Sequence, residues 1–249
     1  MGLETPSYQR IASEWAAKID SGALADGDQL PTRPQMEETY GVSKQVINTA
    51  LTLLLHEGYV VSRARHGTTV YRPTRVRLPL TRFEDNRQPI DSFVAAVEKQ
   101  GMTASQTISV ETLLNERIAE KLEVSSSTAL IARKRVRSVN GIPYALADSY
   151  FVRSHVAGSP IADPSDIPTG GRHVMAKLGI PMDGKSVDHV TCRRPSSAEI
   201  ESLDVAPGVY VIQHVRTSFR IDDTPVRHMV SIFPGDRWEL EYVVGGKNE

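Results

Sequence analysis

The sequence contains little cysteine and no long apolar run. Its one cysteine, Cys192, has no partner for a disulfide within the chain, and a single thiolate cannot build a structural zinc site. No stretch approaches the roughly 18 consecutive apolar residues of a membrane-spanning helix, and residues 1–10 lack the apolar core of a signal peptide. These absences argue against a disulfide-rich secreted domain and against a membrane span, and they predict a cytoplasmic protein.

The net charge of −1 conceals a strongly basic segment. Between residues 40 and 82 a single acid, Glu57, stands against a set of basic residues: Lys44, Arg63, Arg65, Arg72, Arg75, Arg77 and Arg82. A charge imbalance confined to one segment predicts a polyanionic partner for that segment. Charge alone leaves open a second interpretation, in which these residues only keep a surface solvated.

The first 72 residues have the pattern of a winged helix-turn-helix. Apolar residues recur at helical spacing in residues 8–19 and again in residues 47–54, where Ser43 precedes the helix as its cap. A short helix is expected between them at residues 32–40, followed by a turn that contains glycine. Two β-rich runs, residues 59–62 and 68–71, then predict a hairpin.

This motif predicts which residues face DNA. If the second helix of the motif enters the major groove, its first turn faces the bases. Lysine favours guanine edges or phosphate, asparagine and glutamine can pair with adenine, and basic residues on a wing would follow phosphates. A helical packing module, the alternative, leaves the polar turn and the basic wing unexplained. The predicted DNA-binding residues are Ser43, Lys44, Gln45, Asn48, Arg63, Arg65 and His66.

The stretch LPTRPQMEETYGVSKQVINTALTLLLHEGYVVSRARHGTTV, residues 30–70, resembles the GntR family of bacterial transcription regulators. The family pattern runs Leu-Pro-Ser-Glu-Arg, then Val-Ser-Arg-x-Thr-Val-Arg-x-Ala-Leu, then Glu-Gly and a Gly-x-Gly-Thr wing. The core positions match, and the resemblance implies that Gly67 and Thr68 also belong to the DNA-binding surface.

The sequence departs from this pattern where the family usually touches DNA. Lys44, Val46 and Asn48 stand in place of an arginine, a threonine and an arginine. Arg33 and the following proline replace the Glu-Arg pair, so that Arg33 would supply the upstream positive charge one position early. Arg65 replaces the first wing glycine. The resemblance therefore predicts the fold but not the operator sequence.

Residues 73–88 are expected to form a linker, with a short strand at residues 76–80, and residues 89–249 a second domain of α+β class. Within it a helix-plus-hairpin unit occurs twice, as RIAEKLEVSSSTALIARKRVRSVNGIP and AEIESLDVAPGVYVIQHVRTSFRIDDTP. The repeat predicts one sheet built from two similar halves, with a cleft at their junction, although a chance match of two amphipathic units is the alternative.

This order of elements resembles the ligand-sensing domain of the HutC subfamily of GntR regulators. Further marks of that subfamily are Arg135-x-Arg137, Ser149-Tyr150, Gly170-Gly171 and Gly235-Asp236-Arg237. The resemblance then covers nearly the whole chain. It implies an N-terminal winged helix-turn-helix joined to a C-terminal chorismate lyase-like (UTRA) sensor domain with an antiparallel sheet.

Arg135 and Arg137 are the first candidates for binding an effector. Side chains two apart on a strand share a face, and two guanidiniums on one face suit a phosphate or carboxylate. From the residues alone, surface arginines paired with acids are the alternative interpretation. The family resemblance favours the ligand interpretation, and Tyr150 and His173 are further candidates for the same cleft.

The resemblance also bears on the kind of effector. Members that sense sugar phosphates tend to carry acids at two positions that align here with Ala147, beside Asp148, and with Arg227. An effector that is more anionic, or less polyhydroxylated, fits this chain better. Asp148 and Arg227 are accordingly added to the predicted effector site. Some plasmid-transfer repressors that the chain also resembles have no small effector.

Three functions are compatible with these patterns. The first is a homodimeric repressor that binds a palindromic DNA operator and is released by a small anionic effector. The second is a DNA-binding repressor whose C-terminal domain only dimerises or answers to a protein partner. The third is a chorismate lyase-like enzyme, for which no catalytic motif, metal-ligand spacing or cofactor-binding loop is found. We expect no enzymatic activity, no metal and no cofactor.

Overall fold

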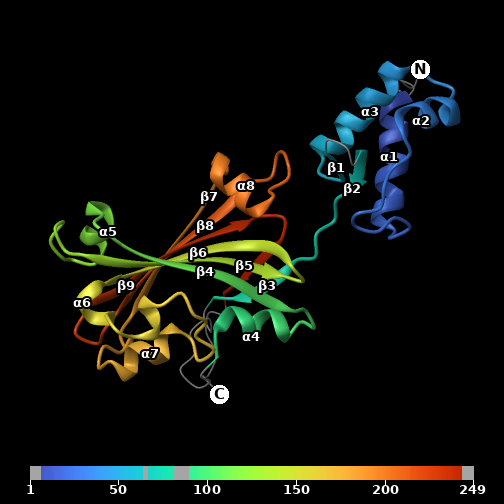
Figure 1. The fold of residues 1–249 in the computed structure, drawn as a ribbon. Helices are drawn as coiled ribbons and strands as arrows, with labels where there is room; N and C mark the ends of the chain where they lie inside the picture. Colours follow the sequence, from blue (N-terminus) through green and yellow to red (C-terminus); the bar gives the residue numbers. More distant parts are fainter. Residues whose placement is uncertain (1–6, 64–66, 81–89, 243–249) are drawn as a thin grey trace. The chain divides into compact units, whose positions relative to one another are not determined.

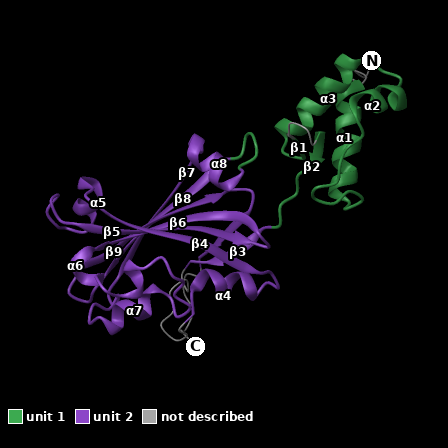
Figure 2. Ribbon diagram, in the orientation of Figure 1, with its two compact units in different colours: residues 1–74, 205–209 green, residues 75–204, 210–249 purple. Residues whose placement is uncertain are grey.

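The described residues, 7–63, 67–80 and 90–242, fold into two units in a computed structural model of the chain (Figures 1 and 2). One unit consists of residues 1–74 with residues 205–209, and the other of residues 75–204 with residues 210–249. The α+β class predicted from the sequence is confirmed, with a helical unit first and a sheet-based unit second.

Three helices and a hairpin make up the first unit. They are α1 (Ser7–Asp20), α2 (Arg33–Tyr40), α3 (Lys44–His56), β1 (Val60–Arg63) and β2 (Gly67–Val70). The apolar faces predicted from helical spacing are buried against one another. Their buried residues include Ile11, Ala12, Trp15 and Ile19 of α1 and Ile47, Ala50, Leu51 and Leu54 of α3. This packing holds the outer face of α3 at the surface.

Local chemistry sets the boundaries of α2 and α3. The side chain of Gln35 accepts a hydrogen bond from the backbone N–H of Thr32, which precedes α2, at 2.8 Å. Gly41 ends the helix in the left-handed conformation with φ 63°, where glycine carries no steric penalty. Ser43 then occupies the cap position of α3, and its carbonyl accepts from the backbone N–H of Val46 and Ile47. The helix, turn and helix predicted from the sequence are confirmed.

A six-stranded antiparallel sheet forms the second unit, with strand order β4-β5-β6-β9-β8-β7. Each half contributes one strand, one helix and a hairpin, and the two halves meet where β6 pairs with β9. The repeat predicted from the sequence is therefore present as two similar halves of one sheet. The first half is β4 (Ala104–Leu113), α5 (Glu116–Lys121), β5 (Leu130–Val139) and β6 (Ile142–Val152); the second is β7 (Ser186–Arg193), α8 (Ser197–Leu203), β8 (Val211–Phe219) and β9 (Pro225–Pro234).

Helices cover both faces of this sheet. Figure 1 shows α4, α6 and α7 on one side of it and α8 on the other. The covering elements are α4 (Ser92–Glu98), α6 (Arg153–Val156), a short 3-10 turn at Pro160–Ala162 and α7 (Gly171–Lys177).

A small parallel sheet joins the start of the second unit to its end. Strand β3 (Val76–Pro79) pairs with β10 (Trp238–Glu241), and the side chains of Val76, Leu78 and Leu80 are buried beside Phe93 of α4. The strand expected at residues 76–80 is thus present, but these residues are part of the core of the second unit. A linker is predicted here from the sequence because arginines and prolines are the local neighbours, and the pairing partner lies about 160 residues further on.

Candidate functional site

The first unit brings several predicted DNA-binding residues to one depression beside α2, α3 and the hairpin. Its lining includes Arg33, Lys44, Gly67 and Thr68, together with one acid, Glu37. Gly67 has φ 73°, and a side chain there would meet the Nε2 atom of Gln29 at 3.0 Å. The positive φ therefore favours glycine at the start of the second hairpin strand, whereas the Gln29 side chain is flexible and could move aside.

The first turn of α3 presents polar side chains to solvent. Ser43, Lys44 and Gln45 are exposed, and the side chain of Ser43 makes no capping hydrogen bond. Asn48 is half-buried, and its Oδ1 accepts a hydrogen bond from Nε of Arg33 at 2.9 Å. Arg63 ends β1 opposite Gly67. The remaining two predicted residues, Arg65 and His66, lie outside the described residues.

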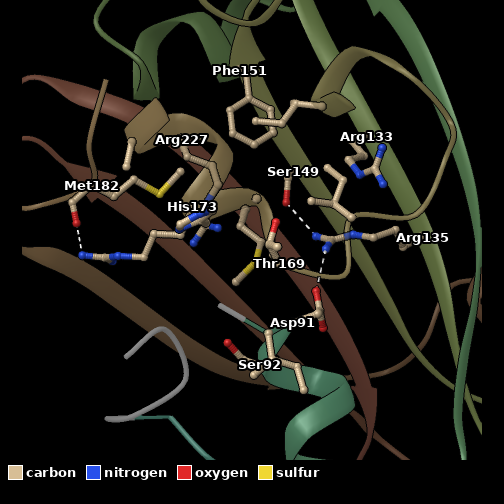
Figure 3. Close-up of a pocket in the computed structure, with 18 of the residues that line it drawn as sticks. Asp91, Ser92, Arg133, Arg135, Ser149, Phe151, Thr169, His173, Met182 and Arg227 are labelled. Carbon is tan, nitrogen blue, oxygen red and sulfur yellow. Dashed lines mark hydrogen bonds and ion pairs between the residues drawn. The ribbon is translucent and has the colours of Figure 1, made fainter. Parts of the chain in front are cut away.

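In the second unit, a cavity of about 290 Å³ lies between the sheet and the elements that cover it. Strands β5, β6 and β9 form one wall, and the loops before α4 and α7 form the other (Figure 3). Arginines are prominent in its lining, and they come from three different elements. They are Arg133, Arg135 and Arg137 of β5, Arg172 of α7 and Arg227 of β9.

Arg133 holds the cavity wall through hydrogen bonds to backbone carbonyls. Its guanidinium donates to the backbone carbonyls of Pro160 and Asp163 and, at 2.6 Å, to that of Ser165. Burial lowers the pKa of Arg133, while nearby aspartates act in the opposite direction. These contacts tie the loop after α6 to the sheet, so Arg133 shapes the site more than it offers hydrogen bonds to a ligand.

Arg135 and Arg137 carry the positive charge at the centre of the cavity. Nη2 of Arg135 donates to Oγ of Ser149 at 2.8 Å, and Nη2 of Arg137 donates to Oδ2 of Asp91 at 2.9 Å. Burial, reinforced by the charge of Arg137, lowers the pKa of Arg135 to about 9. Nε of Arg137 is buried with no hydrogen-bond partner. Two guanidinium groups therefore face a single carboxylate. A bound anion would compensate the remaining positive charge.

Two other predicted residues line the same cavity. Arg227 on β9 is 6% exposed and donates to Oγ of Ser218 at 3.4 Å. His173, in the first turn of α7, is exposed at the mouth. Figure 3 shows His173 and Arg227 together at one side of the cavity, with Arg135 and Asp91 at the other.

Asp148 and Tyr150 do not line the cavity, so that part of the prediction is wrong. Alternate residues of a strand point to opposite faces, and Ser149 and Phe151 are the residues of β6 that line the cavity. On the other face Tyr150 lies 6.5 Å from the ring of His228. Burial, followed by the neighbouring charge of Asp148, raises the pKa of Tyr150 to about 12.

Sequence reasoning missed several residues of the cavity. Arg133 continues the every-second-residue spacing of the two predicted arginines, and this spacing could have identified it. Asp91 and Ser92 could not be found in this way, because they stand at the start of α4, whose position depends on how that helix packs against the rest of the unit. The other unpredicted polar lining residues are Gln106, Ser149, Thr169, Arg172 and Asp183.

A helix-turn-helix with a hairpin wing, joined to a sheet-based domain with an arginine-lined cavity, defines a DNA-binding regulator with a ligand-sensing domain. Residues 7–70 match the family described as bacterial regulatory proteins, gntR family, and residues 99–239 match the UTRA domain. The chain belongs to the GntR family, as a regulator of the HutC type with a UTRA domain.

Relatives are similar to this chain over most of their length. The uncharacterized HTH-type transcriptional regulator SCO4628 of Streptomyces coelicolor is 27% identical, over 97% of this chain and 94% of that protein. The HTH-type transcriptional repressor NagR of Bacillus subtilis is 24% identical, over 94% of this chain and 92% of that protein. The crystal structure of PhnF from Mycobacterium smegmatis matches the fold with a TM-score of 0.60 at 22% identity, over 95% and 100% of the two chains.

Both matched domains belong to transcription regulators. Members of the GntR family bind DNA, and UTRA domains sense small-molecule effectors. In the part of the chain that the structure describes, no group of three or more His, Cys, Asp or Glu side chains is arranged to hold a metal ion. Among the helices of those residues, none is long and apolar enough to cross a membrane.

Proposed function

We propose that the chain is a homodimeric repressor that binds a palindromic operator and is released from it by a small anionic ligand in the cavity. The observation that carries this proposal is the excess of buried guanidinium groups at the cavity centre, with Arg135 and Arg137 facing one carboxylate. Charge-assisted hydrogen bonds from arginine to phosphate or carboxylate are short and strong, especially out of water.

The DNA-binding part of the proposal rests on the first turn of α3. Lys44 and Gln45 are exposed there, and Arg33 and Asn48 extend the same polar surface. One such helix contacts few base pairs, so two copies related by a two-fold axis are needed for specificity. A dimer also gives the ligand a means of control, because it can favour one spacing of the two DNA-binding units over another.

The cavity supports a small and strongly charged ligand over a large neutral one. Its volume of about 290 Å³ lies at the small end of ligand pockets. Arg227 brings a further guanidinium to the side opposite Asp91 (Figure 3). The ligand that suits this arrangement is a compact anion with negative charge at one end or at both.

The proposal is tested in two steps. The purified protein first selects the genomic DNA fragments that it binds, and a panel of metabolites is then tested for compounds that release the selected fragment. We expect a palindrome and at least one anionic compound that releases it. The matched variant is Arg135→Gln, which removes charge in the cavity and leaves the DNA-binding unit intact. It should bind the palindrome normally and resist release.

A palindrome that no compound releases would favour a second unit that only dimerises or that answers to a protein partner. A thermal shift separates these outcomes independently of DNA. A ligand present at 100 times its dissociation constant should stabilise the folded protein by about 2.7 kcal/mol. Loss of that stabilisation in Arg135→Gln would assign the binding to the cavity.

A further inference from the structure

The carboxylate of Asp91 holds two groups of partners at the edge of the cavity. Its Oδ1 accepts hydrogen bonds from the backbone N–H of Phe93 at 3.0 Å and of Val94 at 3.4 Å, which caps α4. Its Oδ2 lies 2.9 Å from Nη2 of Arg137 and 3.9 Å from Nη1 of Arg135. One side chain thus caps a helix and forms ion pairs with Arg137 and Arg135, the second of which Figure 3 shows.

Asp91 is held there as an anion. Burial alone would raise its pKa, but the charges of Arg137 and Arg135, together with the two backbone N–H groups, lower the pKa below its usual value. Its side chain is only 12% exposed. The arginines therefore already hold one carboxylate, in the position where an anionic ligand would find its donors.

We propose that Asp91 is a built-in competitor for the anion site, which a ligand must displace from Arg135 and Arg137 in order to bind. This inference rests on the proposed function of the cavity and adds how that cavity is regulated. A ligand with the charge of a single carboxylate gains little by replacing another carboxylate. A dianion gains more, so Asp91 also selects for the more strongly charged ligand.

Contacts of the backbone hold Asp91 in place, so we expect only its side chain to move when a ligand displaces it from the arginines. The backbone N–H of Asp91 donates to the carbonyl of Pro168 at 3.0 Å. Gly170 lies beside this segment, where a Cβ atom would be in van der Waals contact with the carbonyl oxygen of Ile90 at 3.4 Å. When the carboxylate leaves the arginines, the backbone hydrogen bond can stay in place while Phe93 and Val94 lose their acceptor.

Displacement of the Asp91 side chain would affect elements outside the cavity. Phe93, in the first turn of α4, packs with Val76 and Leu78 of β3 in one buried cluster. The first unit runs to Thr74 and the second begins at the next residue. Strand β3 therefore starts two residues after the end of the first unit. A ligand that uncaps α4 therefore acts on the element that continues, through the chain, toward the DNA-binding unit.

Asp91→Asn separates the two roles of the side chain. Asparagine caps helices as well as aspartate does, so the variant keeps an acceptor for the α4 amides and loses only the charge. Asp222→Asn is the matched control, because Asp222 is exposed, accepts from the backbone N–H of Thr224 in the same unit and does not line the cavity. Titration calorimetry with inorganic phosphate should give at least tenfold tighter binding for Asp91→Asn and less than a twofold change for Asp222→Asn.

A second measurement uses the unmodified protein. Saturating phosphate should accelerate hydrogen exchange of the Phe93 and Val94 amides, as the carboxylate that accepts from them moves away. Equal or weaker phosphate binding by Asp91→Asn, or unchanged exchange in the saturated protein, would overturn the competitor role and leave the anion cavity in place. If folded wild-type protein and variant both fail to bind phosphate or any anion of the panel, the proposed function falls and the inference falls with it.

Discussion

Nε of Arg33 donates a hydrogen bond to Oδ1 of Asn48 at 2.9 Å, linking the first residue of α2 to the exposed face of α3. This contact fixes the orientation of the Asn48 amide, with the oxygen toward Arg33 and the NH2 group directed elsewhere. Both residues depart from the family pattern. Their contact means that the proposed reading of bases by Asn48 depends on a side chain 15 positions earlier in the sequence.

Asn48→Ala should relax the preference for one base pair of the operator. An amide can accept from and donate to the same adenine, and a well-placed interaction of this kind is worth about 1–3 kcal/mol of discrimination. The measurement is binding to the selected operator and to a set of operators with each base pair replaced in turn. The variant should lose discrimination at one position in each half-site and keep it at the others.

Two further variants make this test specific. Thr52→Ala changes an exposed residue further along α3 and should leave the base preference unaltered. The double variant with Arg33→Ala should cost less than the sum of the two single changes, because the residues are hydrogen-bonded partners. An equal loss of affinity for operator and for random DNA in Asn48→Ala would contradict a reading role.

Arg65→Ala should weaken binding to all DNA sequences alike. This prediction rests on the sequence, since Arg65 lies outside the described residues. A basic residue on the wing neutralises a phosphate and releases counterions whatever the base sequence. The plot of log affinity against log salt should become shallower by about 1 for each phosphate that the variant no longer neutralises. An unchanged salt slope together with altered base preference would instead place Arg65 at base edges.

Arg237→Lys should destabilise the second unit by about 3 kcal/mol or more. Arg237 is 2% exposed, and its guanidinium donates to three backbone carbonyls at 2.6–2.7 Å. These carbonyls belong to Pro143, Leu203 and Asp204, so one fork joins β6 to the end of α8. A lysine ammonium cannot reproduce that planar fork, and hydrogen bonds to charged groups contribute about 1.5–3 kcal/mol each.

Urea unfolding at neutral pH measures this cost. Arg153→Lys is the control, because Arg153 is an exposed residue of α6 and its replacement should change the free energy of unfolding little. A loss of less than about 1 kcal/mol in Arg237→Lys would mean that the three carbonyls find other donors or water.

Most of the fold could be predicted from the sequence, because local patterns determine its elements. The helix-turn-helix follows from two apolar stripes and a glycine turn, and the repeated halves of the sheet follow from a repeated pattern. The pairing of β3 with β10 could not be predicted, because it joins residues 76–79 to residues 238–241 and leaves no local signal.

The cavity was predictable only along single strands. Arg135 and Arg137 share a face by the two-residue period of a strand, and they do line the cavity. The sequence does not show which face of β6 points inward, and the predicted residues Asp148 and Tyr150 lie on the face away from the cavity. Asp91 contributes through the packing of α4, which involves residues far apart in sequence.

His228→Asn should make folding stability less sensitive to mild acid. Burial, with the charge of Lys121, lowers the pKa of His228 to about 4 from the ordinary 6.5. Between pH 6.5 and 4 the unfolded chain therefore binds a proton at this histidine that the folded chain does not. The free energy of unfolding consequently decreases as the pH falls through this window. At pH 5 the loss from His228 is at most about 2 kcal/mol by this linkage, because solvent screening can only reduce it.

Asparagine at position 228 keeps an acceptor for Thr217, whose Oγ1 lies 3.0 Å from Nδ1 of His228 in the wild-type protein. Urea unfolding at pH 7.5 and at pH 5.0 should therefore show a smaller difference in stability for the variant than for the wild type. His189→Asn is the control, because His189 is exposed and its replacement should leave that difference unchanged. Equal differences for His228→Asn and the wild type would refute a buried, neutral histidine, since a ring that protonates as easily in the folded chain as in the unfolded chain adds no pH dependence.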